Sequence, residues 1–197
     1  NRNRDNEFPG GALHCGPRQN SGNTQISIID CIFQDNYHDY FGGAIYLSIT
    51  NDALIDNCRF INNSAPTGAS IYIKPDLSSE SKESLITITN SNFSQNKASQ
   101  SASIYAESGK TKKLIIESCS FEEDNGININ DFNNNIDIKN NNFIHSLKEA
   151  SLTITQKEEG TYSNTIRIDS CIFDDCKGDE NKCFYLLFET MLFTFSH

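Results

Sequence analysis

One motif recurs six times along the chain, and this repeat constrains the fold more than any other feature. Each copy reads apolar-x-apolar-x-polar-small-x-Phe-x-x-polar, as in 26–36 (ISIIDCIFQDN) and 166–176 (IRIDSCIFDDC). The anchoring residues are Phe33, Phe60, Phe93, Phe121, Phe143 and Phe173. Their spacings of 27, 33, 28, 22 and 30 residues have a mean of 28. A period of about 20–50 residues is typical of solenoids, propellers and other repeat architectures.

Apolar residues alternate with polar ones inside each copy, which predicts strands rather than helices. Ile28 and Phe33 both belong on the inside, yet the parity changes between Ile28 and Cys31. A straight strand cannot change parity, so we expect a bend of one or two residues between two strands. The bend is predicted at the equivalent positions 29–30, 56–57, 89–90, 117–118, 139–140 and 169–170.

A second, shorter pattern of small residues followed by alternating apolar ones occupies most of the intervals. It is clearest at 10–15, 42–47, 67–73, 101–106 and 149–155, and weaker at 126–130 and 181–188. Strand, polar corner, strand, loop, strand and loop then make one turn of a three-sided solenoid. We therefore predict an all-β right-handed parallel β-helix, a single-stranded solenoid of six or seven coils. Its hand follows the general rule for parallel crossovers.

The same repeat argues for one domain over residues 1–197, with 182–197 as a terminal cap strand. Because the chain begins without Met or a signal peptide, we expect it to be a fragment of a longer protein. A β-propeller would repeat every 40 residues or so with four strands, and a leucine-rich repeat would show Leu-x-x-Leu-x-Leu. A β-sandwich would not keep one motif in register six times.

Charge excludes one broad class of partner. The net charge is −10 with no basic stripe, so we expect no nucleic-acid binding. There is no apolar run of about 18 residues, so we expect no transmembrane segment. The 24 asparagines favour turns over helices.

Equivalent residues of successive coils should stack about 4.8 Å apart. Phenylalanine then lies on phenylalanine, and a column of small residues lies beside the corner: Cys31, Cys58, Ser91, Cys119, Asn141 and Cys171. Stacked inward cysteines are usually small buried hydrophobes. Disulfides are the alternative, and the sequence permits either a Cys171–Cys176 or a Cys176–Cys183 pair. No CxxC motif is present, which argues against zinc.

Candidate catalytic groups do not form a set. The histidines (His14, His38, His145 and His197) fall at unrelated points of the repeat, and we interpret them as loop or turn residues. Acids follow the phenylalanines at Asp35, 122–124 and 174–175, without an accompanying Arg or Lys column. We interpret them as surface acids. The alternative, more specific hypothesis is a weak calcium site at Glu122, Glu123 and Asp124. We expect no cofactor and no catalytic residue.

A tyrosine column is the best candidate for binding. Tyr46, Tyr72 and Tyr105 share one position, and parity places them opposite Ile45, Ile71 and Ile104. If the isoleucines face inward, the tyrosines form an exposed aromatic stripe suited to sugar rings or a protein partner. The alternative is a stack that only stabilises the sheet. Asn62 and Asn92 lie in N-x-S sequons and are candidate glycosylation sites.

The segments 10–13 (GGAL) and 42–45 (GGAI), with FQDN, FINN and FSQN at 33–36, 60–63 and 93–96, resemble the GGA[ILV] and FxxN repeats of polymorphic outer membrane proteins and related adhesin-like β-helix proteins. The resemblance weakens after residue 110, where FEED, FIHS and FDDC lack the fourth-position Asn. It implies secretion or surface display, outside the cell or on its surface, and an adhesin role.

Three functional hypotheses follow. The first is a non-catalytic, adhesin-like surface or secreted protein that binds a glycan or a host or cell-surface protein through one sheet face and its loops. The second is a polysaccharide lyase or hydrolase on a pectin-lyase-like fold, although the hallmarks of pectin-degrading enzymes are missing. The third is a structural spacer in a large surface protein.

Overall fold

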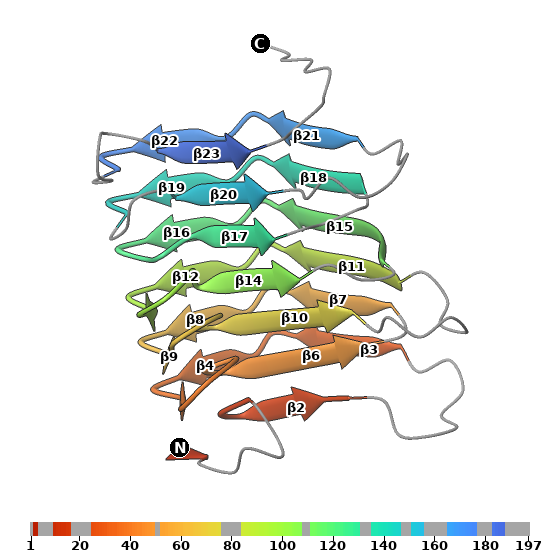
Figure 1. Ribbon diagram of the computed structural model, residues 1–197, viewed down its shortest axis with the longest axis vertical. Helices are drawn as coiled ribbons and strands as arrows, with labels where there is room; N and C mark the ends of the chain where they lie inside the picture. Colours follow the sequence, from red (N-terminus) through yellow and green to blue (C-terminus); the bar gives the residue numbers. More distant parts are fainter. Residues whose placement is uncertain are drawn as a thin grey trace.

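The structure is a computed structural model, and it describes residues 2–3, 10–16, 25–49, 52–75, 84–107, 111–130, 135–146, 151–155, 165–176 and 183–187. Every element within these ranges is a β-strand. The strands are stacked in layers along one axis, and the chain passes once around each layer before rising to the next (Figure 1). The ladders between layers are parallel throughout, as the solenoid prediction requires.

Three long parallel sheets form the sides of the solenoid. The seven-stranded long sheet contains β2 (Leu13–Cys15), β6 (Ile45–Ile49), β10 (Ile71–Pro75), β14 (Ile104–Glu107), β17 (Ile127–Asn130), β20 (Leu152–Thr155) and β23 (Phe184–Leu187). The six-stranded entry sheet contains β3 (Ile26–Ile29), β7 (Ala53–Asp56), β11 (Ser84–Thr89), β15 (Thr111–Glu117), β18 (Asn135–Lys139) and β21 (Ile166–Asp169). The six-stranded phenylalanine sheet contains β4 (Ile32–Gln34), β8 (Arg59–Ile61), β12 (Asn92–Ser94), β16 (Ser120–Glu122), β19 (Asn142–Ile144) and β22 (Ile172–Asp174).

A fourth, short sheet was not foreseen from the sequence. Its two-residue strands are β1 (Arg2–Asn3), β5 (Tyr37–His38), β9 (Ser64–Ala65) and β13 (Lys97–Ala98). These strands lie in the connection between the phenylalanine sheet and the long sheet, where we had expected only loop. Two-residue strands carry no readable alternation, so periodicity could not reveal them.

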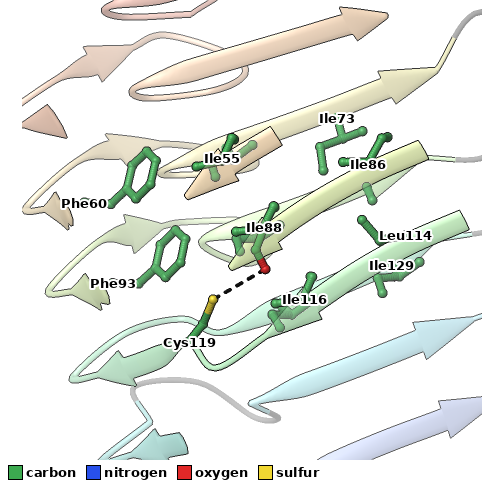
Figure 2. Close-up of a cluster of buried hydrophobic side chains, with 14 of the residues drawn as sticks. Ile55, Phe60, Ile73, Ile86, Ile88, Phe93, Leu114, Ile116, Cys119 and Ile129 are labelled. Carbon is green, nitrogen blue, oxygen red and sulfur yellow. Dashed lines mark hydrogen bonds between the residues drawn. The ribbon is translucent and has the colours of Figure 1, made fainter. Parts of the chain in front are cut away.

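The core is built from columns of identical or similar side chains. The six column phenylalanines stack with ring centroids 4.8–5.0 Å apart and planes within 8° of parallel. Figure 2 shows Phe60 and Phe93 in this stack beside the isoleucines of the entry sheet, among them Ile55 and Ile88. The expected phenylalanine column is therefore confirmed. Phe33 and Phe173, at the two ends, are only partly buried.

Each predicted bend is one residue in the left-handed backbone conformation. The six residues have φ between 50° and 56°: Asp30, Asn57, Asn90, Ser118, Asn140 and Ser170. This conformation reverses the side-chain parity between the entry sheet and the phenylalanine sheet. Asn and Asp tolerate it best among residues with a side chain, which explains the polar corner. A side-chain ladder accompanies the corner, since Asn57 Nδ2 donates to Asp30 Oδ1 at 2.6 Å.

A second left-handed corner follows each phenylalanine. Its residues have φ between 47° and 57°: Asp35, Asn62, Gln95, Glu123, His145 and Asp175. The second corner lies five residues after the first in every coil, as Asp35 does after Asp30. The corner shapes are fixed by the stack rather than by one residue type, because Gln95 and Glu123 also adopt this conformation, which Gln and Glu rarely adopt on their own.

The glycine pairs permit a close approach between coils. A Cβ on Gly43 would lie 2.1 Å from the carbonyl oxygen of Ala69 in the next coil, and Gly42 has φ of 62°. Of the cap strand expected at 182–197, residues Phe184–Leu187 form β23, which pairs with β20. Residues 188–197 lie outside the described residues.

Candidate functional site

The three tyrosines form one column on the outer face of the long sheet, as expected. Tyr46 pairs in register with Tyr72, and Tyr72 with Tyr105. Both ring pairs have centroids 5.3 Å apart, with planes at 6° and 22°. His14 of β2 extends the column, with its ring 5.2 Å from that of Tyr46 and nearly parallel. Ile45, Ile71 and Ile104 are buried on the opposite face of the same strands.

The expected exposure of this column is wrong for two of its members. Tyr46 is 8% exposed and Tyr72 only 2%, while Tyr105 is half-buried. The rings lie face to face, so each tyrosine covers its neighbour, and Phe41 packs against Tyr72 with centroids 4.7 Å apart. A sugar ring cannot stack on faces that the column itself occupies. Side-chain parity predicted correctly that the tyrosines point outward, but it could not predict that neighbouring rings cover them.

Exposed aromatic surface lies instead beside the column, on the turn before the long sheet. Tyr40 is 47% exposed and Phe41 is 39% exposed. Their ring centroids are 6.4 Å apart. Together with His14, Tyr46, Tyr72 and Tyr105 they form what we call the outer aromatic cluster. Sequence reasoning missed Tyr40 and Phe41, although YFGGA at 40–44 places them directly before a glycine pair.

His38 holds this turn in place. Its Nδ1 accepts hydrogen bonds from the backbone N–H groups of Tyr40 and Phe41, both at 3.1 Å. Two N–H donors on one ring nitrogen fix the tautomer, with the proton on Nε2. The imidazole is buried. The turn that carries the exposed aromatic pair is thus tied to the short sheet.

A row of polar side chains runs along the hydroxyl ends of the tyrosines. The Tyr72 hydroxyl donates to Glu107, and Asn130 Nδ2 donates to the Tyr105 hydroxyl at 3.1 Å. Thr155 Oγ1 donates in turn to Asn130 Oδ1 at 2.8 Å. Burial raises the pKa of Tyr72, and the hydrogen bond to Glu107 raises it further. The phenols therefore remain neutral hydrogen-bonding groups at physiological pH.

The proposed calcium residues do not converge, so that hypothesis is wrong for this structure. Glu122 and Glu123 are exposed, whereas Asp124 is 1% exposed and points inward. The parity reverses again at Glu123, which is a left-handed corner residue. Among the described residues, no group of three His, Cys, Asp or Glu side chains is arranged to hold a metal ion. Asp35 and Asp175 also occupy second-corner positions.

Asp124 belongs to an inner ladder that the sequence did not reveal. The last residue of each FxxN segment points inward. Asn63 Oδ1 accepts hydrogen bonds from the backbone N and the Nδ2 of Asn36. Asn96 Oδ1 accepts from Asn63 in the same way, and Asp124 Oδ2 accepts from Asn96. Asn63 Nδ2 also donates to the carbonyl of Phe33 at 2.9 Å. The repeated Asn is therefore a structural residue that satisfies buried backbone groups.

The carboxyl of Asp124 is unusual within this ladder. Burial raises its pKa to about 6, against lowering by hydrogen bonds from Asn96, Ser103 and Gly126. Its Oδ1 accepts the Gly126 N–H at 3.1 Å. A buried carboxyl with a raised pKa is a common feature of active sites. Here its neighbours are amide, hydroxyl and backbone groups of the ladder, which gives it a structural role.

The column of small residues has a shared hydrogen-bonding pattern. Cys31, Cys58 and Cys119 each place the sulfur 3.2–3.4 Å from the carbonyl oxygen two residues earlier. Ser91 makes the same bond at 2.8 Å, so Ser and Cys are interchangeable there. Asn141 Nδ2 reaches the carbonyl of Ile116 instead. Figure 2 shows the further contact from Cys119 to the carbonyl of Ile88.

Burial raises the pKa of Cys58, and raises that of Cys119 to about 12. These two thiols are buried, while Cys31 and Cys171 at the ends of the column are partly buried. All seven cysteines are thiols in this structure. The interpretation of this column as small packing residues is confirmed for its central members.

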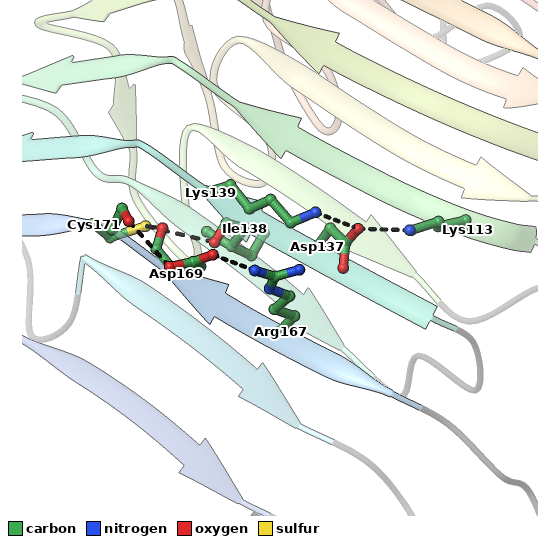
Figure 3. A network of polar contacts seen from close by, with 8 residues as sticks. Lys113, Asp137, Ile138, Lys139, Arg167, Asp169 and Cys171 are labelled. Atoms are coloured by element: carbon green, nitrogen blue, oxygen red, sulfur yellow. Dashed lines mark hydrogen bonds and ion pairs between the residues drawn. The ribbon is translucent and has the colours of Figure 1, made fainter. Parts of the chain in front are cut away.

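Charged side chains gather on the outer face of the entry sheet (Figure 3). Asp137 Oδ2 lies 2.5 Å from Lys113 Nζ and 2.9 Å from Lys139 Nζ. One coil further on, Arg167 Nη2 lies 2.5 Å from Asp169 Oδ2. Burial raises the pKa of Asp137, but the hydrogen bonds and charges of the two lysines outweigh it and hold the pKa below its usual value. Two carboxylates pair with three cations in this group, which makes it a surface ion-pair network.

The remaining candidates occupy separate places. Asn62 and Asn92 are both exposed, and Asn62 Nδ2 donates to Asp35 Oδ1 at 2.7 Å. The expectation of loop histidines is wrong for His14 and His38, which lie in β2 and β5. His145 lies at a second corner, near Asp175. His197 lies outside the described residues.

The family model of the right-handed β-helix region matches residues 16–143 of the chain. The chain belongs to this family. No curated protein and no solved structure matches it significantly. The β-helix assignment agrees with the stacked parallel ladders and with the hand expected from sequence.

The matched part of the β-helix includes most of the outer aromatic cluster and the whole Asn36–Asn63–Asn96–Asp124 ladder. His14 precedes the matched part. The long apolar helix that a membrane span would need does not occur in the ranges that the structure describes.

Proposed function

We propose that this β-helix is a surface-displayed or secreted, adhesin-like protein that binds a glycan or a protein partner through the outer aromatic cluster. The observation that carries the proposal is the exposed Tyr40–Phe41 pair, which His38 orders and the stacked tyrosines support from below. Aromatic side chains on a rigid surface contribute large contact area at low entropic cost.

The polar row beside the cluster supports recognition of a hydroxylated ligand. Glu107, Asn130 and Thr155 present carboxylate, amide and hydroxyl groups along the same face as the rings. An apolar ring edge next to such groups suits a sugar, which has apolar faces and hydroxyl edges, and it equally suits a protein side chain. The resemblance to GGA[ILV] and FxxN repeat proteins supports display at the cell surface.

A binding experiment tests the proposal directly. Purified protein is applied to a printed panel of neutral and acidic oligosaccharides and to intact cultured cells, and bound protein is measured. The Tyr40→Ser/Phe41→Ser variant should weaken the binding found by at least about tenfold, because two exposed aromatic anchors are lost. Thermal unfolding of the variant verifies the fold, since Phe41 also packs on Tyr72.

The matched control removes two exposed apolar residues elsewhere. Ile29 and Ile32 are 47% and 61% exposed, on the entry and phenylalanine sheets. The Ile29→Ser/Ile32→Ser variant should bind as the original chain does. Equal binding by the Tyr40/Phe41 variant would refute the site, and the absence of any binding on the panel or on cells would favour the structural spacer.

A further inference from the structure

Two inward columns face each other at the corner before the long sheet. One is the inner ladder position: Asn36, Asn63, Asn96, Asp124, Ser146 and Cys176. The other, which we call the shoulder column, directly precedes each strand of the long sheet. Its members are linked coil to coil by backbone bonds from Ala44 N to Ser70 O, from Ser70 N to Ser103 O and from Ser151 N to Cys183 O.

The two columns are in contact at two ladder residues, Asp124 and Cys176. Asp124 of the ladder accepts a hydrogen bond from Gly126 N, in the shoulder position of its own coil, at 3.1 Å. A further hydrogen bond joins Asp124 to Ser103, one coil earlier in the shoulder column. Cys176 repeats this arrangement, with its sulfur 3.1 Å from Ser151 Oγ. Asp124 therefore lies against shoulder residues of its own coil and of the preceding one, and Cys176 lies against the shoulder residue of the preceding coil.

Cysteine occupies both columns in the last described coil. Cys176 is the ladder residue and Cys183 is the shoulder residue, and both are partly buried. Their side chains are close enough to interact. Burial raises the pKa of Cys176 to about 11, and the Cys183 thiol contributes to the rise. Both residues converge on Ser151, whose backbone N–H donates to the Cys183 carbonyl at 2.7 Å.

We propose that Cys176 and Cys183 are a disulfide site that locks the last described coil of the β-helix. The oxidant is a small-molecule disulfide such as oxidised glutathione. One cysteine sulfur, as thiolate, attacks the glutathione disulfide, forms a mixed disulfide and releases one glutathione thiolate. The second cysteine sulfur then displaces the other glutathione, so one S–S bond replaces another. Two electrons pass to glutathione, and the two protons lost by the cysteines end on the two glutathione thiols.

The alternative partner for Cys176 is poorly placed. Cys171 belongs to the corner column, on the other side of β22, and its sulfur lies near the carbonyls of Ile138 and Asp169 (Figure 3). The Cys176–Cys183 bond would instead connect the exit of the phenylalanine sheet to the entrance of the long sheet. It would hold β23 against β20 by a covalent link, in addition to the backbone ladder.

Mass spectrometry of the full chain tests the site. The protein is equilibrated with reduced and oxidised glutathione at slightly alkaline pH, remaining thiols are blocked with N-ethylmaleimide, and tryptic peptides are analysed. Lys177 and Lys182 separate the two cysteines. The expected product is therefore a pair of peptides joined through Cys176 and Cys183, with the other cysteines alkylated after unfolding. Oxidation should raise the melting temperature, because the disulfide restricts the unfolded chain. The rise should be only about 5 °C, because the closed loop is short.

The Cys176→Ser/Cys183→Ser variant is the matched control. Serine occupies both columns one coil earlier, at Ser146 and Ser151, so the variant should fold with its melting temperature independent of the glutathione ratio. Alkylation of Cys176 and Cys183 in the oxidised sample would overturn the proposal. A bridge from Cys176 to any other cysteine would overturn it too, as would an equal melting shift in the serine variant.

Discussion

Replacing Asp124 by asparagine should change how stability depends on pH. Asp124 continues a ladder of asparagines, and its pKa is raised from 3.8 to about 6. A raised carboxyl pKa means that the folded protein holds this proton more tightly than the unfolded chain does. The stability contributed by the neutral carboxyl is therefore fully present below about pH 4 and is lost as the pH rises to about 6.

The size of the effect follows from the shift. A difference of about 2 pKa units corresponds to about 3 kcal/mol, at 1.36 kcal/mol per unit. Asparagine has no carboxyl proton to lose. Its Nδ2 can donate a hydrogen bond to a backbone carbonyl of the preceding coil, as Asn96 Nδ2 does to the Phe60 carbonyl at 3.0 Å. It also loses the acceptor that Asp124 offers to Gly126 N, which costs about 1 kcal/mol at every pH. The net gain for Asp124→Asn at neutral pH is then about 2 kcal/mol.

Urea unfolding of both proteins between about pH 3.5 and about pH 7.5 measures this directly. The free energy of unfolding of the variant, minus that of the original chain, should increase by about 3 kcal/mol over this range. Asp137→Asn is the control with the opposite sign. The pKa of Asp137 is held below its usual value, so that variant should lose stability at neutral pH and recover it in acid. An Asp124→Asn difference that stays constant with pH would refute the reasoning.

Three further outcomes are expected. Gly43→Ala should lower the free energy of unfolding by about 3 kcal/mol or more, measured by urea unfolding, because its Cβ would lie 2.1 Å from the Ala69 carbonyl oxygen. Asn63→Ala removes four ladder hydrogen bonds and should cost about 4 kcal/mol, whereas Asn62→Ala, at the exposed corner, should cost about 1 kcal/mol; equal losses would contradict the ladder. Cys119, buried with its pKa raised to about 12, should react with a thiol reagent such as dithionitrobenzoate only after unfolding, and labelling in the native state would disprove its burial.

The sequence predicted the coil because its signal is repeated and local. Every copy has a phenylalanine in the same relation to its neighbours as Phe93. The parity change before Phe93 required a corner at Asn90. Both features depend on alternation and spacing, which a strand imposes directly. The second corner gave no comparable signal, because Gln95, Glu123 and His145 share no side-chain chemistry. Their left-handed conformation is imposed by neighbouring coils.

Burial on the outer face could not be predicted from alternation. Parity correctly directed Tyr72 outward, but its 2% exposure depends on two tyrosines from neighbouring coils and on Phe41 from another turn. The calcium hypothesis failed for a related reason. Consecutive acids at 122–124 looked like one cluster, whereas the corner at Glu123 turns Asp124 into the core. Contacts between coils decide both cases, and they are not local in sequence.

The direction of the backbone ladders determines how this molecule would respond to a pulling force. Backbone hydrogen bonds between coils run along the solenoid axis, and β2 and β23 lie at opposite ends of the long sheet. A force applied between the two ends therefore acts on the coil boundaries in series, so every boundary bears the same tension. The end coils, where Phe33 and Phe173 are only partly buried, should separate first, while the coils between them stay intact. The rod would lengthen under load in steps of one coil.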